Sequence, residues 1–252
     1  MSTTTGAHIL TPSEWNQCVR LGYSAYELGH SGSIVDFINT NFPGLELLVW
    51  LTAVDSLLGG MSAKQLYKVV GFDNRDPFKL IIEYYSEDWD DNVNGLAFSR
   101  TLTKDKDFKI AAHDFFRIPL PHRMMGHGKT MLAYGLQQYL NVGVDAIRVH
   151  ASLTDGGFVW ARAYFQGVNR SEMELILADA KLSLSEEQFK PVESIFDNYY
   201  NKNPDGKAFP INKWSNMDGM DRILRGADWH GELDLNKKEL LAKFKNYVTR
   251  RK

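Results

Sequence analysis

Hydrophobic and polar positions change their spacing twice in the middle of the chain. Apolar side chains first recur at every second position, with Asp114 as the one polar member of that face, which indicates a β-strand. From Met131 to Leu140 the spacing becomes helical, and Gly143 then closes the helix. Alternation returns over residues 147–153 and predicts a second strand. The apolar positions of the first strand, expected to face the core, are Phe108, Ile110, Ala112, Phe116 and Ile118.

The first 77 residues show helical spacing for most of their length. Thr11 followed by Pro12 and Glu14 is typical of a helix start, because the Thr hydroxyl can cap the first turn and Pro fits its first position. The segment Leu45–Leu58 is apolar on most sides, which predicts a buried helix. Helices are expected at residues 11–29, 33–39, 45–58 and 62–70.

The remaining elements follow from weaker patterns. Phe78–Tyr85 fits a helix or a strand, whereas Leu96–Thr103 reads as a strand whose polar turn leads into the strand that begins at Phe108. Residues 171–181, 185–200 and 240–248 have helical spacing. A final strand is expected from Arg222–Leu224 together with Trp229–Leu235.

Composition excludes several classes of protein. The 252 residues carry 29 basic and 31 acidic side chains, so a general nucleic-acid or membrane-surface binder is not expected. Cys18 is the only cysteine, which rules out an intrachain disulfide. Residues 1–6 lack the basic and apolar features of a signal peptide, and Leu45–Leu58 is too short to span a bilayer. We therefore expect a soluble, cytoplasmic protein.

The turn from Arg123 to Thr130 is suited to an anion. Glycine in a turn before a helix lets backbone N–H groups at the positive end of the helix dipole approach a phosphate closely. Gly128-Lys129-Thr130 matches the end of a P-loop, but Arg123 occupies the position where that motif requires its first Gly. The pattern R-x-x-G-x-G fits without exception, as Arg123, Gly126 and Gly128.

In this context the segment resembles motif A of the GNAT acetyltransferase superfamily, whose signature is Q/R-x-x-G-x-G/A. The resemblance covers about sixty residues, from the strand before the turn to Phe165. It implies an α/β (α+β) fold with a mixed central sheet whose fourth and fifth strands splay apart. The implied domain is residues 78–252, with helical additions after residue 170, preceded by a helical region over residues 1–77.

The resemblance further implies acetyl-CoA as cosubstrate. Its pantetheine arm would pair with the strand end near Ile118, and its pyrophosphate would bind the turn. The residues implied in cofactor binding are Ile118, Leu120, Arg123, Met124, Met125, Gly126, His127, Gly128 and Lys129. The implied reaction is direct attack of an amine, from a small molecule or a protein, on the thioester.

Such an attack benefits from a general base and a proton donor. Asp114 and His113 are the candidate bases: burial would raise the pKa of Asp114, and His113 starts near an ordinary value of about 6.5. His150 is a weaker candidate. The acid departs from the family pattern, because Trp160 stands where these enzymes commonly place a tyrosine.

Three hypotheses follow from this. The first is a CoA-dependent N-acetyltransferase, and the second is a GNAT-like module that binds or assembles without catalysis. The third, an NTP-binding protein, rests only on Gly128-Lys129-Thr130. No metal site is expected, and the acceptor and the oligomeric state are not visible in the sequence.

Overall fold

A computed structural model of the chain describes residues 7–29 and 32–250. It falls into two compact units, the N-terminal unit (Met1–Asp145 with Val248–Lys252) and the C-terminal unit (Ala146–Tyr247). Both units combine helices with strands, so the expected α/β class is confirmed. The segment 1–6, considered above for a signal peptide, lies outside the described residues. Among the described residues, no helix has the length and apolar character that crossing a bilayer requires.

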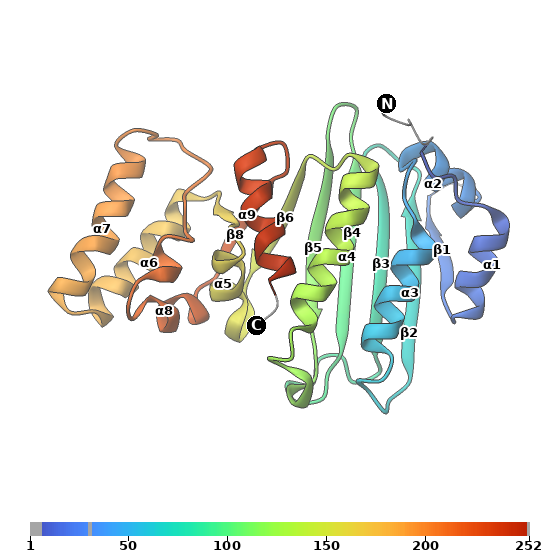
Figure 1. Ribbon diagram of the computed structural model, residues 1–252, viewed down its shortest axis with the longest axis horizontal. Coiled ribbons are helices and arrows are strands. Elements are labelled where there is room, and N and C mark those ends of the chain that lie inside the picture. The colour runs from blue at the N-terminus through green and yellow to red at the C-terminus, as the bar shows by residue number, and fades with distance from the viewer. Residues whose placement is uncertain (1–6, 30–31, 251–252) are drawn as a thin grey trace. The chain divides into compact units, whose positions relative to one another are not determined.

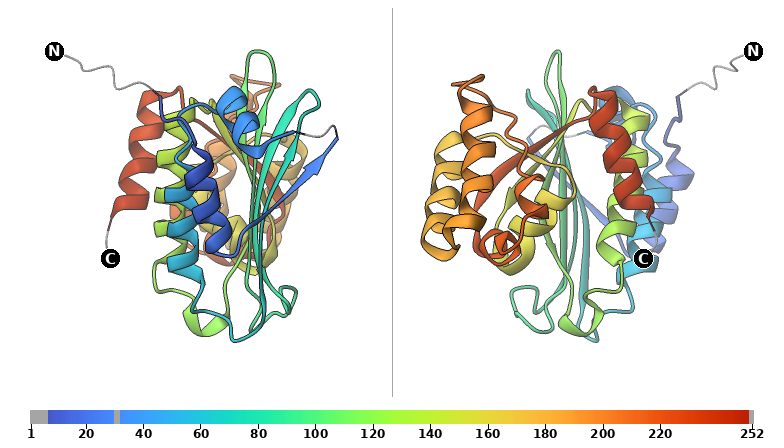
Figure 2. Two further views of the ribbon diagram at one scale, coloured as in Figure 1. Left: turned by 90° about the vertical axis from the view of Figure 1, so that its right-hand side faces the viewer. Right: turned by 60° about the vertical axis from the view of Figure 1, so that its left-hand side comes forward.

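The N-terminal unit is built on strands that lie side by side in the order β1, β2, β3, β4, β5. β1 runs parallel to β2, and the other neighbours are antiparallel. Helices α1, α3 and α4 gather on one face of these strands (Figures 1 and 2). The strands are β1 (Ser24–Leu28), β2 (Leu66–Asp73), β3 (Phe78–Ser86), β4 (Ala97–Lys104) and β5 (Lys109–Arg117). The helices are α1 (Pro12–Arg20), α2 (Ile34–Asn41), α3 (Leu47–Leu58), the short η1 (Leu120–His122) and α4 (His127–Val142).

The core of this unit lies between α3, α4 and the strands. The buried residues of α3 follow helical spacing, and Trp50 among them meets the ring of Tyr139 of α4 edge-on at 5.7 Å. The strands contribute alternate residues, including Val70, Leu80 and Phe98, all at most 2% exposed. Each such side chain stabilises the fold by about 1.5–3 kcal/mol relative to an exposed one.

Two helical predictions in this unit are wrong. The capping box at Thr11 forms as predicted, but α1 ends at Arg20 and β1 follows after Gly22, which has a left-handed φ of 92°. Residues 62–70, predicted as a helix, contain most of β2. Pairing with β3 decides that segment, because strand preference depends on neighbouring strands more than on the local sequence. The ambiguous segment after Phe78 is strand β3.

In the C-terminal unit, β8 lies between β6 and β7 and is antiparallel to both. Helices α6 and α7 run beside each other (Figures 1 and 2), and α7 begins with the predicted Ser185 capping box. The predicted strand at Arg222–Leu224 is wrong, because these residues form α8. The elements are β6 (Ala146–Ala151), α5 (Leu153–Arg162), β7 (Gln166–Gly167), α6 (Arg170–Ser183), α7 (Glu186–Tyr200), η2 (Trp214–Asn216), α8 (Met220–Gly226), β8 (Trp229–Asp234) and α9 (Lys238–Thr249).

Candidate functional site

The predicted turn lies between β5 and α4, as the sequence pattern requires. Gly126 is the residue that caps α4, and its φ of 88° lies in the left-handed region that glycine adopts without strain. The Thr130 amide donates the first backbone hydrogen bond of the helix to the Gly126 carbonyl, at 3.2 Å. The amides of His127 and Gly128 therefore precede the hydrogen-bond ladder of α4, at the positive end of its dipole.

Arg123 anchors the start of the turn. Its Nε donates to the carbonyl of Ile118 at 3.0 Å, and its Nη2 donates to the carbonyl of Asn92 at 3.0 Å. The Leu120 amide donates to the Val93 carbonyl at 2.7 Å, so two bonds tie this segment to the loop before β4. The guanidinium thus has a structural role, and its implied contact with a pyrophosphate remains a prediction.

The tip of the turn presents apolar side chains to solvent. Met124 is 81% exposed and Met125 68%, and Met124 has a left-handed φ of 66°. An added Cβ would meet nothing within 4 Å at Gly126 and only the Phe116 ring, at 3.6 Å, at Gly128. The backbone here is therefore approachable, as the binding of a cofactor pyrophosphate would require.

A β-bulge lies in β5 before this turn. Ser99 of β4 pairs with Phe115, and Thr101 pairs with Ala112. Between these pairs, Arg100 alone on β4 faces both His113 and Asp114 on β5. A bulge of this kind redirects side chains, and bulges are common beside active sites. The two candidate bases therefore sit at the irregular point of the strand.

His113 is on the buried side of β5, where it is only 5% exposed. Its Nε2 is hydrogen-bonded to the hydroxyl of Tyr139, 2.9 Å away on α4. Burial, assisted by the nearby Arg100, holds the pKa of His113 well below its ordinary value of 6.5. His113 is therefore a neutral residue of the core, out of reach of a substrate in this structure.

Asp114 is exposed, so the prediction that its face is buried is wrong. The buried positions of this strand are Ala111 and His113, because the helices cover the opposite face from the one that the apolar pattern favoured. Asp114 Oδ2 accepts a hydrogen bond from the Thr101 hydroxyl at 2.8 Å. Burial, together with the charge of Asp114, raises the pKa of Glu83 on β3.

Sequence reasoning missed Arg100, Thr101 and Tyr139. Arg100 is 3% exposed and donates to the Phe115 carbonyl at 2.9 Å, and its burial lowers its pKa. A charged residue between Phe98 and Leu102, on the alternating face of a strand, was the available signal for Arg100. Thr101 and Tyr139 carried no such signal, since only folding brings them to the bulge.

The expected position of the acid is occupied by packing residues of the C-terminal unit. Trp160 meets Phe165 edge-on at 5.0 Å, and Phe165 is fully buried. Tyr164, the nearest tyrosine in sequence, has a left-handed φ of 68°.

His150, the weaker candidate base, lies in the C-terminal unit and pairs with Asp228. Within the described residues, no three His, Cys, Asp or Glu side chains gather as a metal site would need.

The comparisons with known proteins assign no family to this chain. No family model matches the chain, and no curated protein matches it significantly.

Proposed function

We propose that this chain is a CoA-dependent N-acyltransferase of the GNAT type, which transfers acetyl from acetyl-CoA to an amine of a small molecule or a protein. The observation that carries the proposal is the left-handed Gly126 that caps α4, in the connection from β5 through η1 to α4. It gives the pyrophosphate a turn of accessible amides, from Met124 to Lys129, at the positive end of a helix. The pantetheine arm would lie along the strand end near Ile118.

Asp114 is the base in this proposal. It is exposed, it lies on β5 thirteen residues before α4 begins at His127, and the Thr101 hydroxyl donates a hydrogen bond to one of its carboxylate oxygens. The amine nitrogen attacks the thioester carbonyl, its proton passes to Asp114, and the C–S bond breaks to release CoA thiolate. His113 is buried against Tyr139 and positions the strand instead of taking the proton.

A second function, binding or assembly without catalysis, is favoured by one observation. Trp160 stands where a proton donor is expected, and it packs against Phe165. An indole N–H does not supply a proton at neutral pH, so the thiolate would leave unassisted or the chain would not catalyse transfer. The NTP-binding alternative is weakened by Arg123, whose side chain bonds to Ile118 where a P-loop needs glycine.

Calorimetric titration separates these functions. We expect heat from acetyl-CoA and none from ATP with Mg²⁺. Heat from ATP alone would establish the NTP-binding alternative, and heat from neither would favour the non-catalytic module.

Turnover then tests the base. Asp114→Asn should lower the rate of acetyl transfer by about 10²-fold or more while acetyl-CoA still binds. Asp107→Asn, in the exposed turn before β5, should leave the rate unchanged. Equal rates in the two variants would refute the role of Asp114.

A further inference from the structure

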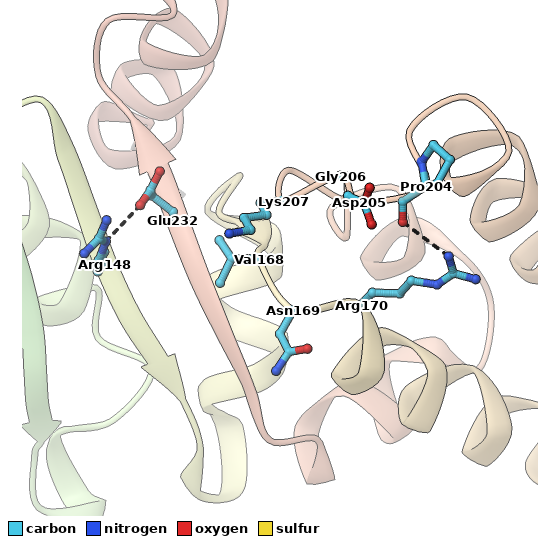
Figure 3. A pocket seen from close by; sticks show the side chains of 9 residues that line it. All are labelled: Arg148, Val168, Asn169, Arg170, Pro204, Asp205, Gly206, Lys207 and Glu232. Atoms are coloured by element: carbon cyan, nitrogen blue, oxygen red, sulfur yellow. Dashed lines mark hydrogen bonds and ion pairs between the residues drawn. The ribbon is translucent and has the colours of Figure 1, made fainter.

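The C-terminal unit contains a cleft that the proposed acyl transfer does not use. Its volume is about 720 Å³, and a hollow of about 400 Å³ adjoins it, since Arg148, Val168, Asn169 and Glu232 line both. Cavities of about 300–1,000 Å³ are typical of small-molecule sites. Figure 3 shows side chains from β6, β8, the start of α6 and the loop after α7 around the larger cleft.

Lys207 is the cation of this cleft that is available to a ligand. Arg148 is paired with Glu232 at 2.9 Å, and Arg170 is paired with Glu174 at 2.8 Å. Lys207 is exposed and, among the described residues, makes no hydrogen bond or ion pair. Its side chain extends toward Val168 (Figure 3). Asp205 lines the same cleft, so a carboxylate and the Lys207 ammonium share this space.

His230 presents a defined imidazole nitrogen to the adjoining hollow. Glu172, in the first turn of α6, accepts from the His230 backbone amide at 2.7 Å and bonds to Nδ1 at 2.7 Å. A carboxylate only accepts, so Nδ1 carries the proton. In the neutral ring, Nε2 is therefore an acceptor. The Glu172 side chain is 17% exposed, whereas that of His230 is 54% exposed, so the carboxylate is shielded and the ring is open.

His150 fixes the plane of that ring. The two imidazoles are cross-strand partners on β6 and β8, stacked with centroids 4.4 Å apart and planes 3° apart. His150 Nε2 is itself 2.5 Å from Asp228. Contact with His150 on one face and with Glu172 at one edge leaves His230 a single orientation, in which Nε2 is the atom available to a ligand.

We propose that this cleft binds a small polyhydroxylated molecule with an oxyanion group, a phosphate or a carboxylate. Lys207 pairs with the oxyanion, and Nε2 of His230 accepts a hydrogen bond from a ligand hydroxyl. Both groups are required, because Lys207 binds the anionic group of the ligand and Nε2 of His230 binds its hydroxyl.

Titration of the full chain at constant ionic strength tests the site. The probes are ribose 5-phosphate, gluconate and unmodified ribose. We expect ribose 5-phosphate or gluconate to bind at least tenfold more tightly than ribose, and to move the imidazole ¹⁵N resonances of His230. Binding of the phosphate alone or of the carboxylate alone identifies the anion. Binding of neither above the level of ribose would overturn the proposal.

Matched variants test the ligand contacts of Lys207 and His230 separately. Lys207→Ala should weaken binding of the anionic probe by about tenfold, and Lys213→Ala, an exposed lysine of the same unit outside the cleft, should not. His230→Gln should weaken binding at least fivefold, with its fold verified by circular dichroism. Equal affinities for the two lysine variants would remove Lys207 from the site, and an unchanged affinity in His230→Gln would remove His230.

Discussion

His113 and Tyr139 are hydrogen-bonded across the candidate site, with Nε2 and the hydroxyl oxygen 2.9 Å apart. The imidazole comes from β5 and the phenol from α4, the two elements that flank the turn at Gly126. Both side chains are buried, at 5% and 1% exposure. This bond therefore ties β5 to the C-terminal part of α4 inside the core.

Tyr139→Phe removes that bond and keeps the ring. We expect the free energy of unfolding to fall by about 1–3 kcal/mol, because a buried polar atom of His113 loses a hydrogen bond. Urea denaturation measures the change. Tyr134→Phe, on the same helix but 44% exposed, is the control and should change stability by less than about 0.5 kcal/mol. A Tyr139 variant as stable as the control would show that the bond contributes nothing.

His113 also makes stability depend on pH. Its pKa in the folded protein lies well below the ordinary 6.5, owing to burial and to Arg100. Above that ordinary value neither state is protonated, and the stability is fully present. As the pH falls below it, the unfolded chain binds a proton that the folded protein refuses, so stability falls by up to about 1.4 kcal/mol per pH unit until the folded pKa is reached.

Urea midpoints at about pH 7.5, 6.5 and 5.5 measure this slope. His113→Gln should have a shallower slope than the wild type, whatever its absolute stability, and His122→Gln should keep the wild-type slope. Parallel profiles for the wild type and the His113 variant would contradict the prediction.

Gly126 and Gly128 are separated by one residue but should respond oppositely to alanine. Gly126 has a φ of 88°, and an L-residue there costs about 1–2 kcal/mol. Gly128 lies within α4, and its added Cβ would make an ordinary contact of 3.6 Å with Phe116. Gly128→Ala should therefore gain up to about 1 kcal/mol from helix propensity. Thermal unfolding compares the stability of the two variants. A Gly126 variant at least as stable as the Gly128 variant would contradict the predicted backbone strain at position 126.

Gly157 of α5 lies close against the backbone of α8. A Cβ there would lie 2.1 Å from the Leu224 carbonyl oxygen and 2.9 Å from that of Ala227, and backbone cannot move aside cheaply. Gly157→Ala should destabilise the C-terminal unit by about 3 kcal/mol or more. Gly156→Ala, whose Cβ would be 3.5 Å from its nearest neighbour, is the control. Denaturation followed by tryptophan fluorescence reports both, and equal stability would show that the helices separate readily.

The sequence by itself determined the order of elements around the candidate site. Strand β5, the turn, helix α4 and strand β6 follow the predicted changes of spacing, and Gly143 ends α4 as predicted, with a left-handed φ of 69°. The capping box at Ser185 was equally visible. These features are local, because a cap or a change of period involves residues within a few positions of one another.

Only the tertiary structure decided which face of β5 is buried. Period-two spacing reveals alternation, but it does not show where a bulge lies or on which side helices pack. Asp114 is therefore exposed and His113 buried, the reverse of the expectation. The pairing of β2 with β3 likewise overrode a local helical pattern, because strand pairing is a contact between distant segments.

The partners that define both sites were likewise decided by folding. Thr101 is 13 residues from Asp114, Tyr139 is 26 from His113, and Glu172 is 58 from His230. No spacing rule links residues at such separations. The sequence supplied the chemical groups and the local elements that carry them, and the packing of strands and helices selected which groups meet, because burial and hydrogen bonding are satisfied only across the assembled fold.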